Sequence, residues 1–217
     1  MSVRIGAVSP MDNAMEAIGA AFAEQWPEAE LFHVLDESLY LDFAGGKAQT
    51  EETGERLSKL LDYAADCHAD GLLFTGSVFG RWVQAARADM EIPCLTSHEA
   101  MIEEAFTHGS RLGILTTVAG SLKCLVDDID RYSKEQDKPV TITNHVLDEA
   151  RPIILSGDVE AHDRMVTEAA DRMTDCDCLM LGQFSMTGAM RLFTDMPDRP
   201  VLTSAHTAVR KLKRLLG

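Results

Sequence analysis

The chain has 217 residues, a formal net charge of -15 and a hydrophobic content of 46%. This length is enough for one domain or two small ones with a buried core. The acidic surface repels the phosphates of nucleic acids and anionic membranes, so neither is an expected partner. The first residues lack the pattern of a secretory leader, and no apolar stretch is long enough to cross a bilayer, so we expect a cytoplasmic protein.

The five cysteines do not form a disulfide framework. They stand at positions 67, 94, 124, 176 and 178, an odd number without paired spacing, which favours a reducing compartment. Cys176 and Cys178 are close together, but no second Cys or His pair follows at ligand spacing. We interpret them as buried structural thiols and expect no metal site.

Short apolar runs alternate with amphipathic stretches of helical length. The expected strands are 3–8, 30–35, 71–75 and 93–96, and the expected helices are 13–25, 51–68, 79–89 and 98–108. The order then repeats, with strands at 111–117, 141–146, 178–182 and 200–204. Helices are expected at about 118–135 and 158–174, after the third strand of this round, and at the end of the chain. This alternation predicts an α/β fold with parallel sheets covered on both faces.

The second round of elements repeats residues of the first. The triplet RIG at residue 4 is matched by RLG at residue 111, and Asp70 is matched by Asp177. The segment PCLTS at residue 93 is matched by PVLTS at residue 200. All three matches are displaced by the same 107 positions (111 - 4, 177 - 70 and 200 - 93). One shift that aligns three separate strand regions indicates an internal duplication.

We therefore predict two similar lobes related by a pseudo-twofold axis, each a four-stranded mostly parallel sheet flanked by helices. The expected first lobe is 1–97 and the second is 98–217, and the C-terminal helix is allowed to cross over to the first. In such sheets ligands bind outside the carboxyl ends of the strands. The predicted site is a cleft between the lobes, with the strand ends facing inward.

The residues that follow the predicted strands are rich in hydroxyls. They are Ser9, Pro10, Met11 and Asp12, then Thr75, Gly76 and Ser77 in the first lobe, and Thr116, Thr117, Gly182, Gln183, Phe184 and Ser185 in the second. Hydroxyls and free amides at helix starts stabilise negative charge, so this composition suits a small carboxylate. The alternative is that these Ser and Thr side chains only cap the following helices. Under the shift of 107, Gly76 corresponds to Gln183.

Several segments resemble the aspartate/glutamate/hydantoin racemase superfamily. They are RIGAVSP, ADGLLFTGSVFG, SHEAMIEEA, GSRLGILTT, GQFSM and RPVLTSAHTAVRKL, and together they extend over almost the whole chain. The resemblance implies an Asp/Glu racemase-like fold, no cofactor, and a homodimer or higher homo-oligomer. It also implies a pair of cysteines that remove and return a proton at the substrate α-carbon. The matching positions here are Gly76 and Gln183, neither of which carries a thiol.

Three interpretations stay open at this point. The first is a cofactor-independent isomerase, racemase or lyase that acts at the α-carbon of a small carboxylate, including chemistry like that of arylmalonate decarboxylase or maleate isomerase. Glycine at position 76 is then expected to leave room for an α-substituent. The second is a degenerate carboxylate-binding protein. The third is an enzyme silenced by a Cys-to-Gly change at position 76.

The candidate residues follow from this interpretation. The catalytic positions are Gly76, Gln183, Ser77 and Ser185, and the substrate-binding candidates are Ser9, Pro10, Asp12, Thr75, Val78, Thr116, Thr117 and Phe184. Asp12 is a possible general base if it is buried, with the cap of the following helix as its alternative role. His98 and His206 follow the two repeated PxLTS strands and are further candidates, with surface or helix-cap roles as the alternative.

Overall fold

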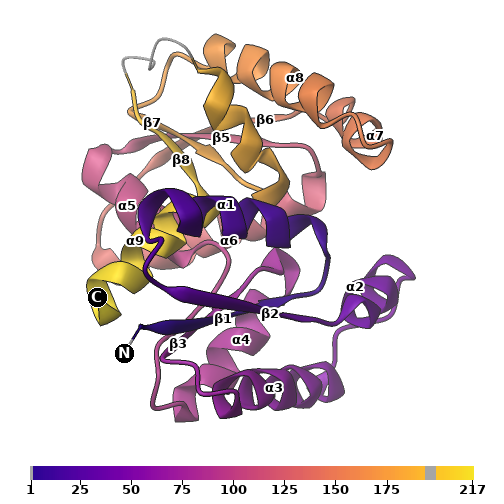
Figure 1. The fold of residues 1–217 in the computed structure, drawn as a ribbon. Coiled ribbons are helices and arrows are strands. Elements are labelled where there is room, and N and C mark those ends of the chain that lie inside the picture. Colours follow the sequence, from indigo (N-terminus) through magenta and orange to yellow (C-terminus); the bar gives the residue numbers. More distant parts are fainter. Residues whose placement is uncertain (1, 194–198) are drawn as a thin grey trace. The chain divides into compact units, whose positions relative to one another are not determined.

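A computed structural model describes residues 2–193 and 199–217 and divides them between two compact units. The first unit extends to Ser97 and includes Ala208–Gly217, and the second is His98–Thr207. Each unit contains a four-stranded sheet in which every neighbouring pair of strands is parallel. Helices flank both sheets (Figure 1). The predicted fold class is confirmed.

The sheet of the first unit has the strand order β2-β1-β3-β4. Its strands are β1 (Arg4–Ser9), β2 (Glu30–Leu35), β3 (Gly71–Phe74) and β4 (Cys94–Leu95). Its helices are α1 (Asn13–Gln25), α2 (Glu37–Ala44), α3 (Glu51–Asp66) and α4 (Gly80–Ala86), with 3-10 turns η1 (Ser77–Phe79) and η2 (Arg87–Asp89). The central strands β1 and β3 are almost entirely buried, as expected for strands covered on both faces.

The sheet of the second unit has the order β6-β5-β7-β8. Its strands are β5 (Arg111–Thr116), β6 (Thr141–Val146), β7 (Cys178–Leu181) and β8 (Val201–Thr203). Its helices are α5 (Glu99–His108), α6 (Ala119–Gln136), α7 (Ala150–Leu155) and α8 (Val159–Arg172), with the 3-10 helix η3 (Phe184–Leu192) after β7. The last helix, α9 (Ser204–Leu216), begins in the second unit and ends in the first.

The two sheets share one hydrogen-bond pattern, displaced by the 107 positions seen in the sequence. Ile5 pairs with Gly71 in the first sheet, and Leu112 pairs with Cys178 in the second. The repeated aspartates act alike: the Arg4 amide donates to Asp70 Oδ2 at 2.7 Å, and the Arg111 amide donates to Asp177 Oδ2 at 2.9 Å. Each carboxylate thus caps the start of the strand next to it. The register supports the duplication that the sequence matches indicate.

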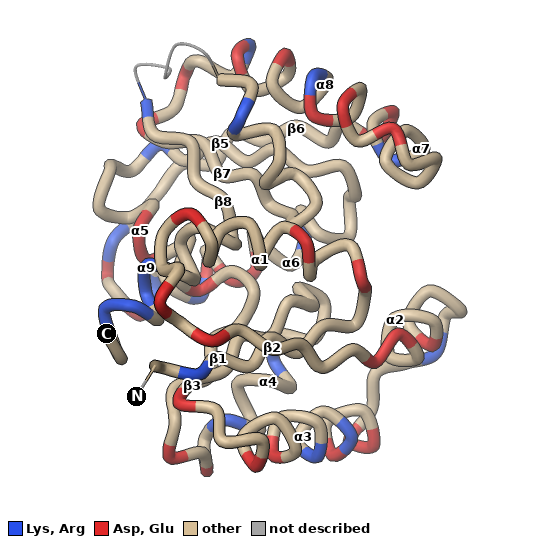
Figure 2. The backbone as a smooth tube through the Cα atoms, in the orientation of Figure 1, with Lys and Arg blue, Asp and Glu red and all other residues tan. Residues whose placement is uncertain are grey.

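Charged residues lie mainly on the helices and loops, and few of them stand within the strands (Figure 2). Helix α3 shows why: Leu57, Leu61 and Ala64 recur at helical spacing and are buried, and the rest of the helix is largely polar. Together with Phe74, Phe79 and neighbouring side chains they form an apolar core under one face of the first sheet. Most acidic residues are therefore surface residues, with the buried Asp163 as an exception, and the core clusters of each unit are apolar.

Two short helices were not expected from the sequence. They are α2 and α7, each of which follows the second strand of its unit. The predicted helix 79–89 is also divided, into η1, α4 and η2. Predicted strand 93–96 is shorter than expected, with only Cys94–Leu95 in the ladder.

Candidate functional site

Two buried hydroxyls stand side by side at the carboxyl end of the first sheet. Ser9 is the last residue of β1 and Thr75 follows β3, and the Thr75 amide donates to the Val8 carbonyl at 3.0 Å. Both side chains are more than nine-tenths buried, and neither hydroxyl has a hydrogen-bond partner among the described residues. A buried polar group without a partner costs about 1–3 kcal/mol, so this pair favours a bound group that completes it.

Gly76 comes directly after Thr75 and is enclosed by apolar side chains. Its φ of -91° and ψ of 97° are accessible to any residue, so backbone conformation does not require glycine here. A Cβ at this position would lie 2.7 Å from a ring carbon of Phe74, 2.7 Å from Cγ of Pro10 and 2.9 Å from a ring carbon of Phe79. Carbon atoms prefer separations of about 3.5–4.0 Å. A side chain at position 76 would therefore have to displace these three side chains.

The carboxyl end of the second sheet repeats this arrangement with different side chains. Thr116 corresponds to Ser9, is fully buried, and its hydroxyl also has no partner within the described ranges. Gln183 follows β7 and is half-buried. Its Oε1 accepts from the Thr117 amide at 2.5 Å and from the Thr117 hydroxyl at 2.9 Å. Thr117 thereby holds the amide oxygen, and the Gln183 Nε2 group is left to donate.

The turns after β3 and β7 are built alike. The Phe79 amide donates to the Gly76 carbonyl and the Met186 amide donates to the Gln183 carbonyl, both at 3.1 Å. Each bond closes the first turn of a 3-10 helix, so the amides that precede it have no acceptor within that helix. Free amides of this kind attract negative charge. The two turns suit an anion, as the hydroxyls do.

The other predicted site residues are divided between buried and exposed positions. Pro10 and Phe184 are buried, and Ser77, Val78 and Ser185 are half-buried. Asp12 is exposed and occupies the N-cap position of α1 without a side-chain cap bond. The burial on which a general-base role depends is not found at Asp12.

The two histidines considered from the sequence have partners within their own unit. His98 is buried, and its Nδ1 lies 3.3 Å from Asp128 Oδ2. His206 Nδ1 lies 2.8 Å from the Thr203 hydroxyl. His98 directly precedes α5 and His206 is the third residue of α9, so both lie at helix starts, one of the positions considered for them.

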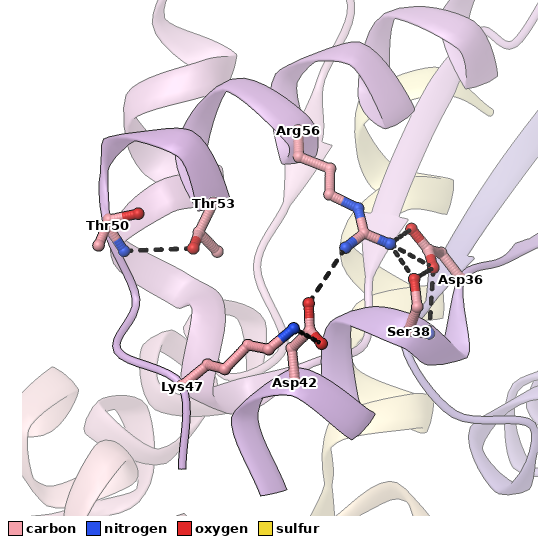
Figure 3. A network of polar contacts seen from close by, with 7 residues as sticks. All are labelled: Asp36, Ser38, Asp42, Lys47, Thr50, Thr53 and Arg56. Atoms are coloured by element: carbon pink, nitrogen blue, oxygen red, sulfur yellow. Dashed lines mark hydrogen bonds and ion pairs between the residues drawn. The ribbon is translucent and has the colours of Figure 1, made fainter. Parts of the chain in front are cut away.

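A polar network between α2 and α3 could not be expected from the sequence, because α2 itself was missed. Arg56 donates to both carboxylate oxygens of Asp36, at 2.6 and 2.8 Å, and lies 3.6 Å from Asp42 (Figure 3). Lys47 donates to the other oxygen of Asp42 at 2.6 Å. Burial by itself would raise the pKa of Asp36, but hydrogen bonds from Ser38 and Arg56 and the Arg56 charge lower it overall.

This network borders a cavity of about 180 Å³. Its walls include Leu39, Phe43, Lys47, Thr53, Arg56 and Phe79. The Phe79 ring makes edge contacts with both Phe43 and Phe74, with centroids 6.1 Å apart in each case. One aromatic side chain thus forms part of the cavity wall and also encloses Gly76.

The described cysteines do not offer a reactive thiol at the strand ends. Cys178 lies inside β7, and burial, followed by the charges of Cys176, Asp177 and Glu104, raises its pKa to about 12. In the part of the chain that the structure describes, no three His, Cys, Asp or Glu side chains are grouped as metal ligands. No helix within those residues has the length and apolarity to span a membrane.

The fold and the two equivalent strand-end sites define a duplicated α/β protein with parallel sheets, and comparison with known proteins places it in a family. The model for the Asp/Glu/hydantoin racemase family matches residues 12–212. The chain belongs to this family, and the resemblance predicted from the sequence motifs is confirmed. No curated protein matches the sequence.

Solved structures of the same fold are distant in sequence. Allantoin racemase from Klebsiella pneumoniae is 19% identical, with a TM-score of 0.73 over 99% of this chain and 88% of that one. Glutamate racemase from Bacillus anthracis is 16% identical, with a TM-score of 0.72 over 99% and 81%. Unliganded arylmalonate decarboxylase is 16% identical, with a TM-score of 0.67 over 100% and 94%. At these identities the likeness shows the fold alone.

Proposed function

We propose that this protein is a cofactor-independent isomerase, racemase or lyase that acts at the α-carbon of a small carboxylate. Membership of the Asp/Glu/hydantoin racemase family supports this reaction class. The observation that carries the proposal is the presence of buried hydroxyls without partners at the carboxyl end of each sheet: Ser9 and Thr75 at the ends of adjacent strands of the first sheet, and Thr116 at the end of β5 in the second. Hydroxyls and free amides at these ends bind a carboxylate and stabilise the charge that grows on it when a bond to the α-carbon breaks.

The same geometry limits what residues 76 and 183 do. Gly76 has no side chain, and Gln183 has an amide whose oxygen is held by Thr117. An amide neither takes up nor releases a proton near neutral pH, so we propose that Gln183 donates a hydrogen bond from Nε2 to the substrate. Ser77 follows Gly76, and Ser185 lies two residues after Gln183. Both are half-buried, and we propose that they complete the polar lining of the two strand ends.

A carboxylate-binding protein without catalysis is the second candidate. The observation that favours it is the closed packing around Gly76, where Pro10, Phe74 and Phe79 occupy the space that a reactive side chain would need. The same packing counts against the silenced-enzyme alternative, because a cysteine at position 76 would have to displace these three side chains.

The deciding experiment measures exchange of the α-proton in deuterium oxide and release of carbon dioxide. The substrates are a panel of amino acids, hydantoins and 2-substituted malonates, and binding of each acid is followed by calorimetry. We expect exchange or decarboxylation with at least one compound, without added metal or cofactor. Binding without turnover would support the carboxylate-binding function instead. The proposal would be refuted if no compound of the panel were bound or turned over.

Two variants connect the result to the site. Ser9→Ala and Thr116→Val remove a buried hydroxyl from each sheet and are each expected to weaken carboxylate binding by roughly 10- to 150-fold, since a hydrogen bond to a charged group contributes about 1.5–3 kcal/mol. Ser156→Ala is a matched control, because that hydroxyl is exposed and donates to the Ile153 carbonyl of α7, the helix that ends directly before it. The expected homo-oligomer and cytoplasmic location stay predictions, and size-exclusion chromatography tests the first.

A further inference from the structure

A histidine and an aspartate are buried together in the first turn of α8. His162 is fully buried and Asp163 is 3% exposed. Helix α8 precedes β7, so it runs antiparallel to the strands, and its first turn lies at the carboxyl end of the second sheet. Gln183 lies at the same end, directly after β7. Within the second unit, the pair therefore stands at the end of the sheet where the proposed chemistry takes place.

The contact between the two side chains fixes the state of the imidazole. His162 Nδ1 lies 3.0 Å from Asp163 Oδ1, within hydrogen-bond distance. A carboxylate accepts a hydrogen bond, so the neutral tautomer that fits this contact has its hydrogen on Nδ1 and a lone pair on Nε2. Nε2 is buried and has no partner among the described residues. A carboxylate that orients an imidazole and leaves Nε2 free stabilises the imidazolium that forms when Nε2 takes up a proton.

The segment that carries Gln183 packs against this pair. A Cβ at Gly188, in η3, would lie 2.4 Å from Asp163 Oδ2, so the carboxylate sits directly over the glycine backbone. Arg191 of η3 approaches the same oxygen to 3.6 Å from an exposed position. The neighbouring Thr187 hydroxyl is buried and, like His162 Nε2, has no partner within the described ranges. His162 Nε2 on α8 and the Thr187 hydroxyl on η3 are therefore both buried without a hydrogen-bond partner among the described residues.

We propose that His162, oriented by Asp163, is the acid–base group of the second unit. The inference rests on the proposed function. In the step, Nε2 takes the proton from the substrate α-carbon, and the electron pair of the broken C–H bond moves into the carboxylate to form an enediolate. In the proposed step η3 moves away from α8, so the imidazolium exchanges its proton with water and returns a proton to the same face of that carbon. The step therefore gives α-proton exchange and consumes no oxidant, reductant or cofactor, and inversion requires a second proton donor on the opposite face.

His162 differs from the other two histidines considered for the site. His98 is also paired with a carboxylate, that of Asp128, but Arg131 donates to Asp128 at 2.8 Å, whereas Arg191 lies 3.6 Å from Asp163. His206 is paired with the Thr203 hydroxyl, which stabilises an imidazolium less than a carboxylate does. The buried imidazole with both a carboxylate partner and an unpartnered Nε2 is His162.

The test compares His162→Gln and Asp163→Asn with wild type. His145→Gln is the matched control, since His145 is an exposed histidine on β6. Binding is measured by calorimetry, and α-proton exchange is measured from pH 5 to 9 with the panel acid that wild type turns over. We expect the exchange rate of His162→Gln to fall by about 100-fold or more, the usual contribution of general acid–base catalysis, with little change in affinity. Asp163→Asn should also slow exchange and shift its pH profile, and His145→Gln should match wild type.

A second measurement on unmodified protein covers the case in which a variant does not fold. Nitrogen-15 spectra of wild type are expected to show the Nδ1–H tautomer of His162 and a change at Nε2 when the acid binds. The inference would be overturned if the Nε2 chemical shift stayed the same when the protein bound an acid whose α-proton it exchanges.

The outcomes also separate the inference from the proposed function. If wild type exchanges the α-proton and His162→Gln exchanges it at the same rate, the role of His162 is overturned and the proposed function is not. Binding without exchange, or no binding by any acid, overturns both the reaction and the role of His162.

Discussion

Replacing Gly76 with alanine tests the packing at the end of β3. At most positions with ordinary backbone angles, a Gly-to-Ala change stabilises a protein by about 0.4–1 kcal/mol, because it restricts the unfolded chain. At Gly76 the new methyl group would meet Pro10, Phe74 and Phe79 at 2.7–2.9 Å. Overpacking of this kind costs about 1–3 kcal/mol. The balance is a net destabilisation of about 1–2 kcal/mol.

For a protein of this size, that loss lowers Tm by roughly 2–8 °C. The assay is a thermal melt followed by circular dichroism, with Gly19→Ala as the control. Gly19 lies within α1 and has no atom within 4 Å of its Cβ position, so alanine there should raise Tm through helix propensity. An unchanged or higher Tm for Gly76→Ala would refute the closed packing around this residue.

Three further outcomes are expected. Cys178, with its pKa raised to about 12, should not react with a thiol reagent at pH 8 until the protein is unfolded, as shown by mass spectrometry of the labelled peptides. Asp36 has a pKa lowered from 3.8, so its pairing with Arg56 stabilises the fold above that value and is lost as the pH falls through the folded-state pKa. Asp36→Asn should therefore melt lower at pH 7 and lose less stability than wild type between pH 5 and pH 2. Thr117→Val removes one of two bonds to Gln183 and should cost about 1 kcal/mol in denaturant unfolding, and an unchanged midpoint would contradict that contact.

The strands and the duplication could be predicted because their signals are local and repeated. Central strands buried on both faces give continuous apolar runs, and a single displacement of 107 positions places Asp70 and Asp177 in the same role. Helix α2 was missed because its eight residues, ESLYLDFA, are too few to show a clear helical period. Its position depends on the ion pairs of Arg56 with Asp36 and Asp42, contacts between residues far apart in sequence.

The candidate site was predictable only in part. The hydroxyls Ser9, Thr75 and Thr116 could be named from the ends of the predicted strands, but their lack of partners became visible only in the structure. The closed packing at Gly76 depends on two rings and a proline that no sequence pattern brings together. His162 was not considered at all, because a histidine beside an aspartate in a helix is common. Its significance comes from burial and from the unpartnered Nε2.

The most direct test of the account is a crystal structure with the panel acid that binds most tightly. The account predicts that the carboxylate of this ligand accepts hydrogen bonds from the Ser9 and Thr75 hydroxyls, next to Gly76. A ligand bound elsewhere, for example in the cavity beside Arg56 and Lys47, with both hydroxyls still unpartnered, would contradict it.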